Sequence, residues 1–108
     1  MEYKSKHVAH RVETIGGRHG GGTPGIRYLY RGVFIECHGY FEGEHCVCWQ
    51  AIDSDGYSAF AHGWNLMTTK REIDREYEEY SGSFPGYDDD ALKRMGVSKE
   101  FYLKYKDK

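Results

Sequence analysis

Two short connections that each close on a glycine constrain the fold of this chain more than any other feature. Residues 41–43 read Phe-Glu-Gly and residues 54–56 read Ser-Asp-Gly. A three-residue hairpin connection built on a type I turn needs a left-handed residue at its third position, where glycine meets no steric penalty. Both segments are therefore predicted to be hairpin turns, so that residues 28–62 form three adjacent antiparallel strands.

The two turns also predict which side chains share a face of the sheet. With these connections Tyr40 lies opposite Glu44 and Asp53 lies opposite Tyr57, and side chains alternate between faces with a period of two. One face is apolar and is predicted to be the core: Leu29, Val33, Ile35, Cys37, Val47, Trp49, Ala51, Ala59 and Ala61. The opposite face is mixed: Tyr28, Tyr30, Phe34, His38, Tyr40, Cys46, Cys48, Gln50, Ile52, Phe60 and His62.

A helix is predicted to follow the sheet. Thr69 and Glu72 have the spacing of a capping box, in which the hydroxyl and the carboxylate each satisfy an amide of the first turn. Ile73, Tyr77 and Tyr80 then form one apolar stripe that can lie on the core face of the sheet. The predicted fold class is α+β, with a three- to four-stranded antiparallel sheet packed against one main helix, and short C-terminal helices.

A chain of 108 residues can build one hydrophobic core but not two, so we predict a single domain over residues 1–108. Its strand-hairpin-helix core spans residues 28–80. Residues 1–27 are flexible or hold a weak first strand, and their glycine-rich run, 16–25, is a loop or alternatively a phosphate or nucleic-acid contact. Residues 81–108 form a C-terminal helical tail.

The tail contains signals for two short helices. The run Asp88-Asp89-Asp90 suits the positive end of a helix, and Gly96 is placed to end that helix. Ser98 can cap a last helix. We therefore expect two helical segments after residue 87.

Composition argues against a membrane or secreted protein. No run of about 18 apolar residues exists to span a bilayer, and the start of the sequence lacks the apolar region of a signal peptide. The three cysteines, an odd number, do not suit a disulfide scaffold. A cytoplasmic location is expected.

Acidic residues concentrate in one part of a chain whose net charge is only −2. Residues 72–90 hold eight acids against Arg75 alone, whereas residues 1–35 are basic. The acids either keep a helix face soluble or offer an acidic surface to a basic partner, such as the nucleic-acid groove of another protein. The predicted partner-binding residues are Glu72, Asp74, Glu76, Glu78, Glu79, Tyr87, Asp88, Asp89 and Asp90.

A zinc site is a further hypothesis. The predicted register places His38 opposite Cys46 and His62 opposite Cys48, on one face of three adjacent strands. Two cysteines and two histidines suit tetrahedral zinc. Half-buried packing of the same side chains is the alternative.

Catalytic motifs are absent from the sequence, which indicates a binding protein rather than an enzyme. Ten tyrosines, two tryptophans and five phenylalanines serve either as a contact surface or as half-buried cover of the sheet. The alternatives to a protein-binding function are a small nucleic-acid-binding protein that uses the basic N- and C-terminal segments, and a small zinc-binding domain.

Three segments resemble one class of protein. They read Tyr28-x-Tyr30-Arg31-Gly32-x-Phe34-Ile35, Trp49-Gln50-Ala51-x-Asp53-x-Asp55-Gly56-Tyr57 and Thr69-Lys70-x-Glu72-Ile73-Asp74. This pattern resembles the strand, hairpin and helix of small accessory proteins encoded by phages and other mobile elements, anti-CRISPR inhibitors among them. The resemblance implies a non-enzymatic inhibitor in the host cytoplasm. Such an inhibitor binds a host nucleoprotein complex, often through an acidic surface that mimics nucleic acid.

Overall fold

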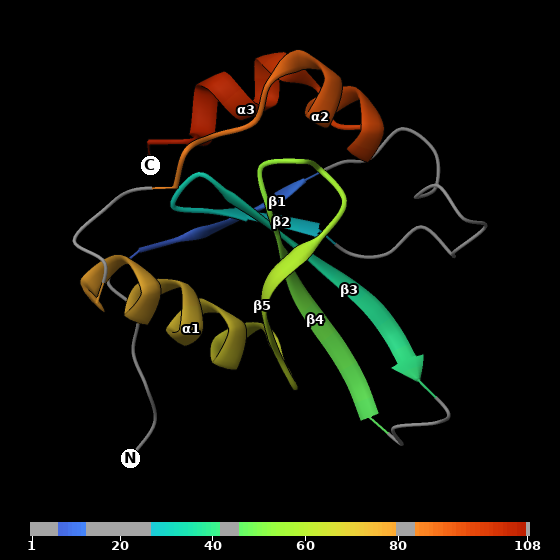
Figure 1. Cartoon of the computed structure of the whole chain (residues 1–108), viewed down its shortest axis with the longest axis vertical. Helices are drawn as coiled ribbons and strands as arrows, with labels where there is room; N and C mark the ends of the chain where they lie inside the picture. The colour runs from blue at the N-terminus through green and yellow to red at the C-terminus, as the bar shows by residue number, and fades with distance from the viewer. Residues whose placement is uncertain (1–6, 13–26, 42–45, 80–83, 108) are drawn as a thin grey trace.

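The computed structural model describes residues 7–12, 27–41, 46–79 and 84–107, and of residues 38–41 and 46–48 it describes the backbone alone. Five strands form one antiparallel sheet in the order β1-β2-β3-β4-β5 (Figure 1). The strands are β1 (Ala9–Val12), β2 (Arg27–Tyr30), β3 (Val33–Phe41), β4 (Cys46–Ile52) and β5 (Ala59–Gly63). The helices are α1 (Leu66–Glu79), α2 (Asp89–Met95) and α3 (Lys99–Tyr105). The predicted α+β class is confirmed, with five strands in place of three to four.

The additional strand arises from a two-residue turn that the sequence analysis missed. Arg31 and Gly32 have φ angles of 52° and 81°, the conformation of a type I′ hairpin, and Tyr30 lies opposite Val33. This turn divides the predicted first strand into β2 and β3. Leu29 therefore lies on the face of Phe34, and Tyr28 and Tyr30 lie on the face of Val33, so the predicted faces of β2 were wrong.

The predicted strand register was also wrong, but the error left most of the core face intact. Ile35 lies opposite Ala51, and Ala51 lies opposite Ala61, each two residues from the predicted pairing. A shift of two residues returns each side chain to the same face. Irregularities between Cys37 and Tyr40 and between Ala51 and Ile52 each change the register by one residue, and the pairs next to the connections, Phe41 with Cys46 and Ile52 with Ala59, are already offset from the predicted pairing.

The second irregularity also changes which side chains of β5 are buried. Ile52 lies opposite Ala59, which is exposed, while Phe60 packs with Ala61 against the core on the α1 side. Ala59 had been predicted in the core and Phe60 on the mixed face. The extra residue in β5 reverses both assignments, because it interrupts the alternation of side chains.

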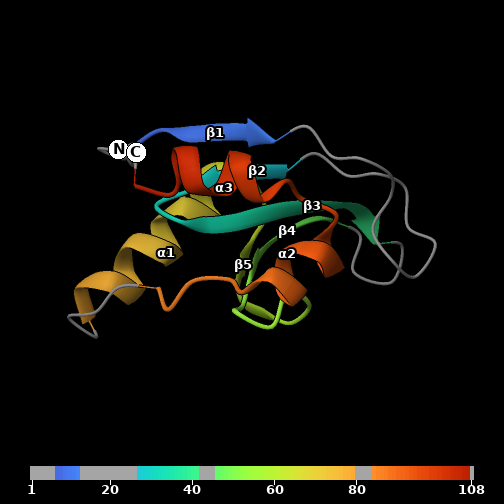
Figure 2. The ribbon, with the colours of Figure 1, turned by 90° about the horizontal axis from the view of Figure 1, so that it is seen from above.

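Helices cover both faces of the sheet, so the molecule has three layers. α1 packs over one face, in a cluster we call the α1-side core: Tyr30, Val33, Ile35, Ala51, Ala61 and Ile73. α2 and α3 cover the other face in the C-terminal-side core: Val12, Leu29, Phe34, Ile52, Tyr87, Ala91, Leu92, Met95, Val97 and Tyr102. Figure 1 shows α2 and α3 together and apart from α1, and Figure 2 shows α3 beside β1 and β2. The face predicted to be mixed therefore packs against α2 and α3 and contributes to a second core.

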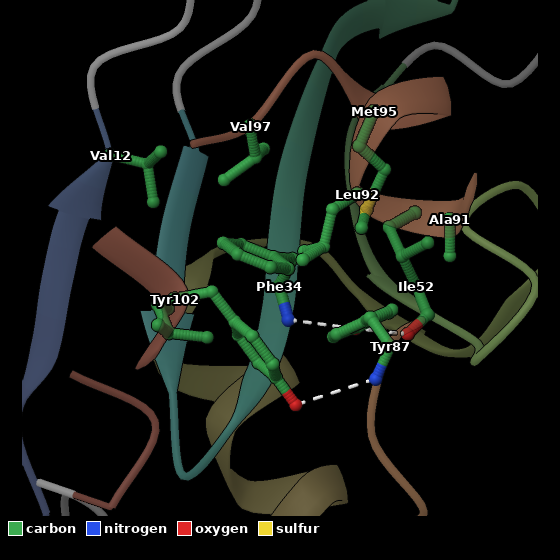
Figure 3. Close-up of a cluster of buried hydrophobic side chains, with 10 residues drawn as sticks. Val12, Phe34, Ile52, Tyr87, Ala91, Leu92, Met95, Val97 and Tyr102 are labelled. Carbon is green, nitrogen blue, oxygen red and sulfur yellow. Dashed lines mark hydrogen bonds between the residues drawn. The ribbon is translucent and has the colours of Figure 1, made fainter. Parts of the chain in front are cut away.

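Tyr87 attaches the C-terminal layer to the sheet (Figure 3). Its hydroxyl donates to the Ile52 carbonyl at 2.6 Å and accepts from the Phe34 amide at 3.0 Å. Its own amide donates to the Tyr102 hydroxyl at 3.4 Å. Burial raises the pKa of Tyr87 well above its ordinary value. The hydroxyl of Tyr87 therefore bridges β3 and β4, and its backbone amide donates a hydrogen bond to α3.

A buried ion pair lies in the same layer. Arg27 Nε and Glu36 Oε1 are 2.9 Å apart across β2 and β3, and both side chains are 4% exposed. Arg27 also donates to the carbonyl of Met95, the last residue of α2. Carbonyls at a helix C-terminus carry partial negative charge, so the guanidinium bridges the sheet to α2.

The β4–β5 turn contacts α2 directly. Gly56 has the predicted left-handed conformation, with φ of 72°, and a Cβ there would lie 2.6 Å from the Ala91 carbonyl oxygen. The Asp55 carboxylate accepts hydrogen bonds from Ser58 and from the Tyr57 amide, which lower its pKa. The turn is wider than predicted, because the Asp53 amide donates to the Ser58 carbonyl at 2.7 Å. The other predicted turn glycine, at position 43, lies outside the described residues.

The first helix begins earlier than predicted. α1 starts at Leu66, and Asn65 Oδ1 accepts from the Thr68 amide at 2.8 Å, which makes Asn65 the capping side chain. The Thr69 hydroxyl is buried and donates to the carbonyls of Asn65 at 3.0 Å and Trp49 at 3.3 Å. The predicted capping box at Thr69 was therefore wrong.

The two C-terminal helices follow their predicted signals. Asp88 accepts from the Ala91 amide at 2.8 Å at the start of α2, and Gly96 ends this helix with φ of 70°. Ser98 caps α3 by accepting from the Phe101 amide at 3.4 Å. These predictions are confirmed.

Candidate functional site

The outer surface of α1 carries most of the predicted partner-binding acids. Glu78 and Glu79 are exposed, and Glu72 and Glu76 are partly exposed. At 100° per residue, Glu72, Glu76 and Glu79 fall on one flank of the helix, as predicted, and Glu78 on the other. We call these four glutamates, together with Trp64 and Met67, the α1 surface.

Arg75 reduces the acidity of the first flank. Its guanidinium lies 3.2 Å from Glu79 and 3.8 Å from Glu72, and the hydrogen bond to Glu79 raises the pKa of Arg75. The three carboxylates of this flank and one guanidinium leave a net charge of −2. The flank is therefore acidic but mixed, and its two ion pairs fix the direction of two of its carboxylates.

Asp74 does not belong to this surface, although it was predicted to contact a partner. It is 7% exposed, and its Oδ1 accepts from the Tyr30 hydroxyl at 2.6 Å and from Arg31 Nη1 at 2.8 Å. The carboxylate thus joins α1 to the end of β2. Burying it is feasible because two donors replace the water that it loses.

The predicted residues beyond α1 divide into two kinds. Tyr87 is 8% exposed and belongs to the C-terminal-side core, so its assignment to a contact surface was wrong. Asp88, Asp89 and Asp90 are exposed at the start of α2, and Asp89 lies 2.9 Å from Lys99. Because α2 covers the opposite face of the sheet from α1, these acids form a separate group and do not extend the α1 surface.

Two apolar side chains lie at the start of α1 and were missed by the sequence analysis. Trp64 is 69% exposed and Met67 is 46% exposed, within three residues of each other. Trp64 lies in the segment between β5 and α1 and belongs to neither core cluster. Asn65, which caps α1, follows it directly. A tryptophan next to a capping asparagine was the sequence signal for this position.

The pairings on which the zinc hypothesis rested are not formed. His62 lies opposite Gln50 and not Cys48, and Cys46 lies opposite Phe41 and not His38. The side chains of His38, Cys46 and Cys48 lie outside the described residues. Among the side chains that the structure describes, no three His, Cys, Asp or Glu residues gather as a metal site. Zinc binding stays a prediction, which elemental analysis of protein purified without chelator would test.

Within the described part of the chain, no helix has both the length and the apolar character needed to cross a bilayer. Comparison of the chain with known protein families, with curated proteins and with solved structures finds no match. The resemblance to accessory proteins of phages and mobile elements stays a prediction.

Proposed function

We propose that this protein is a non-enzymatic binding protein that docks onto a basic protein partner through the α1 surface. The observation that carries the proposal is the position of exposed Trp64 and Met67 at the start of a helix whose outer side carries four glutamates. Tryptophan and methionine are enriched at protein interfaces, and here both lie exposed within three residues of each other.

The two parts of the α1 surface have different physical roles in this proposal. Trp64 supplies a large apolar area, and covering this area with a partner would contribute a large share of the binding energy. Glu76 and Glu78 supply charge that accelerates the encounter with a basic surface. Arg75, which pairs with Glu72 and Glu79, places a positive group within the acidic flank, so the flank presents both signs of charge to a partner.

The narrower function that we propose is inhibition of a host nucleoprotein complex by a protein of phage or mobile-element origin, of the anti-CRISPR or another anti-defence type. It rests on the sequence resemblance and on the acidic residues of α1. Arg75 within the acidic flank favours an interface specific to one protein over general mimicry of a phosphate backbone. The host cytoplasm would be the place of action.

The test compares three variants with the native protein. Proteins captured from a bacterial lysate by the native protein are identified, purified and used for rate measurements at two salt concentrations. The triple variant Glu72→Gln, Glu76→Gln and Glu79→Gln should slow association, and more so at low salt. A matched control, Asp89→Asn, Asp90→Asn and Glu100→Gln, removes the same charge from the C-terminal layer and should leave the rate unchanged.

Trp64→Ala should instead raise the dissociation rate by roughly tenfold or more, as expected of a hot-spot residue. Equal association rates for the two triple variants, together with unchanged dissociation for Trp64→Ala, would exclude the α1 surface as the interface. Affinity for DNA or heparin with steep salt dependence would instead support the nucleic-acid-binding alternative.

A further inference from the structure

A pocket of about 380 Å³ lies at the opposite end of α1 from Trp64. Its walls come from the β2–β3 turn, the second half of α1, the segment that leads into α2, and the end of α3. This volume falls within the range of about 300–1,000 Å³ that is typical of small-molecule sites. The residues that matter for its chemistry are Arg31, Gly32, Tyr77, Phe84, Tyr102 and Lys106, and we call the site the turn pocket.

Arg31 is held rigidly in the wall of the turn pocket. Its Nη1 donates to Asp74 at 2.8 Å, and its guanidinium carbon lies 4.4 Å from the centroid of the Tyr77 ring. The Tyr77 hydroxyl in turn donates to the Arg31 carbonyl at 2.8 Å. The Arg31 side chain is nevertheless 27% exposed, so part of its fixed array of N–H donors reaches the pocket.

The conformation of Arg31 is unfavourable for an arginine. Its φ of 52° is left-handed, a conformation that is sterically unfavourable for a non-glycine residue. Asparagine or glycine would satisfy the first position of a type I′ turn with less strain. The turn therefore does not explain the arginine, whereas its ion pair with the buried Asp74 and the position of its side chain in the pocket wall do.

A second cation reaches the pocket from the end of α3. The Lys106 Nζ atom lies 5.8 Å from the centroid of the Tyr102 ring, and the Lys106 carbonyl approaches Gly32 so closely that a Cβ there would be 3.3 Å from it. Lys106 and Arg31 thus converge from segments 75 positions apart in the chain. Among the described residues that line the pocket, Arg31 and Lys106 are the cations and Asp107 is the carboxylate, so N–H donors for an anion come from Lys106 and from Arg31 beyond its bond to Asp74.

Aromatic side chains complete the lining. Tyr77, Phe84 and Tyr102 come from three different segments, and burial raises the pKa of Tyr77, which keeps its hydroxyl protonated at neutral pH. We propose that the turn pocket binds a small anion that carries a flat ring. Arg31 and Lys106 hold its phosphate or carboxylate group, and the aromatic side chains contact the ring.

Four probes test this proposal by calorimetric titration of the full chain. Adenosine monophosphate carries both ring and phosphate, phenylacetate carries ring and carboxylate, adenosine is a ring without charge, and inorganic phosphate is an anion without a ring. At least one of the first two should bind roughly tenfold or more tightly than either of the last two. Whichever of adenosine monophosphate and phenylacetate binds more tightly identifies the acidic group. If neither bound more tightly than adenosine and inorganic phosphate, the proposal would be overturned.

Variants locate the binding. Lys106→Met should weaken binding of the preferred probe by roughly tenfold, because it removes a charge-assisted contact. Lys104→Met is the matched control: it removes the same charge from α3, where Nζ lies 5.2 Å from the Tyr105 ring and outside the pocket lining. Arg31→Gln should weaken binding as strongly, with thermal melting as the check on its fold. Equal affinities of the native, Lys106→Met and Lys104→Met proteins would exclude the turn pocket.

Discussion

Replacement of Tyr87 by phenylalanine tests how the C-terminal helices are attached to the sheet. The ring should keep its place, because it packs at centroid distances of 5.1 Å from Phe34 and 5.5 Å from Tyr102. Only the hydroxyl is lost. That hydroxyl donates to the Ile52 carbonyl at 2.6 Å and accepts from the Phe34 amide at 3.0 Å.

The expected loss of stability follows from these two bonds. Phe34 and Ile52 are fully buried, so water cannot readily replace the hydroxyl at either backbone group. A buried polar group left without a partner costs about 1–3 kcal/mol, so Tyr87→Phe should lower the free energy of unfolding by about 2–4 kcal/mol. For a domain of this size that corresponds to a fall in Tm of roughly 10 °C or more.

Urea titration followed by far-ultraviolet circular dichroism measures this loss. Tyr57→Phe is the matched control, because Tyr57 is 55% exposed, and it should change the free energy of unfolding by no more than about 0.5 kcal/mol. If Tyr87→Phe proved as stable as the control, the hydroxyl would not bridge β3 and β4. The attachment of the C-terminal layer would then depend on apolar packing and on the hydrogen bond from Arg27 to Met95.

Three further predictions concern stability. Gly56→Val should lower the free energy of unfolding by more than about 1 kcal/mol, since it strains a positive φ and meets the backbone of α2; an unchanged urea midpoint would contradict this. Arg27→Met should cost about 3–5 kcal/mol by leaving the buried Glu36 without its guanidinium, and Arg27→Met with Glu36→Leu should cost far less; a double-mutant cycle decides. Burial raises the pKa of Tyr77 and Tyr87, so the contribution of the two protonated hydroxyls to stability is complete below a pH of about 10 and is lost as the pH rises further. Urea denaturation at a series of pH values should show this loss, and the free energy of unfolding of Tyr87→Phe should fall less steeply with pH.

Features decided by short-range contacts could be predicted from the sequence. Asp88, Gly96 and Ser98 act on amides or carbonyls within four residues of themselves, and Gly56 acts through its own φ angle. In each case one segment of sequence contains both the signal and its partner. The helix boundaries of the tail and the left-handed glycine were therefore predicted correctly.

Features decided by distant residues could not be predicted in the same way. Asp74 is acidic and lies on a polar part of the helix, and its burial depends on Tyr30 and Arg31, which lie 44 and 43 positions away. Tyr87 is buried because Phe34, 53 positions away, offers an amide. The chemistry of these two side chains suits a surface as well as a core, so the sequence alone did not separate the possibilities.

The turn at Arg31 was missed for a different reason. A two-residue hairpin is recognised by Asn-Gly or Asp-Gly, and arginine at the first position lacks that signal. The turn pocket depends on this turn, and the candidate site at Trp64 lies between a strand and a helix whose capping residue was predicted at Thr69, four residues after Asn65. The turn pocket therefore lies where a local rule is broken, as expected of a functional position, whereas the start of α1 follows the capping rule at Asn65.

Because α2 and α3 cover the second face of the sheet, this face stays uncovered during synthesis until the last part of the chain has been made. Neighbouring strands of the sheet are neighbours in sequence, so they can pair soon after they leave the ribosome. Leu29, Phe34 and Ile52, which are completely buried in the finished molecule, then face solvent until residues 84–105 have been translated. At about 5–20 residues per second this interval lasts a few seconds, during which the nascent sheet presents an apolar face to chaperones and to other nascent chains.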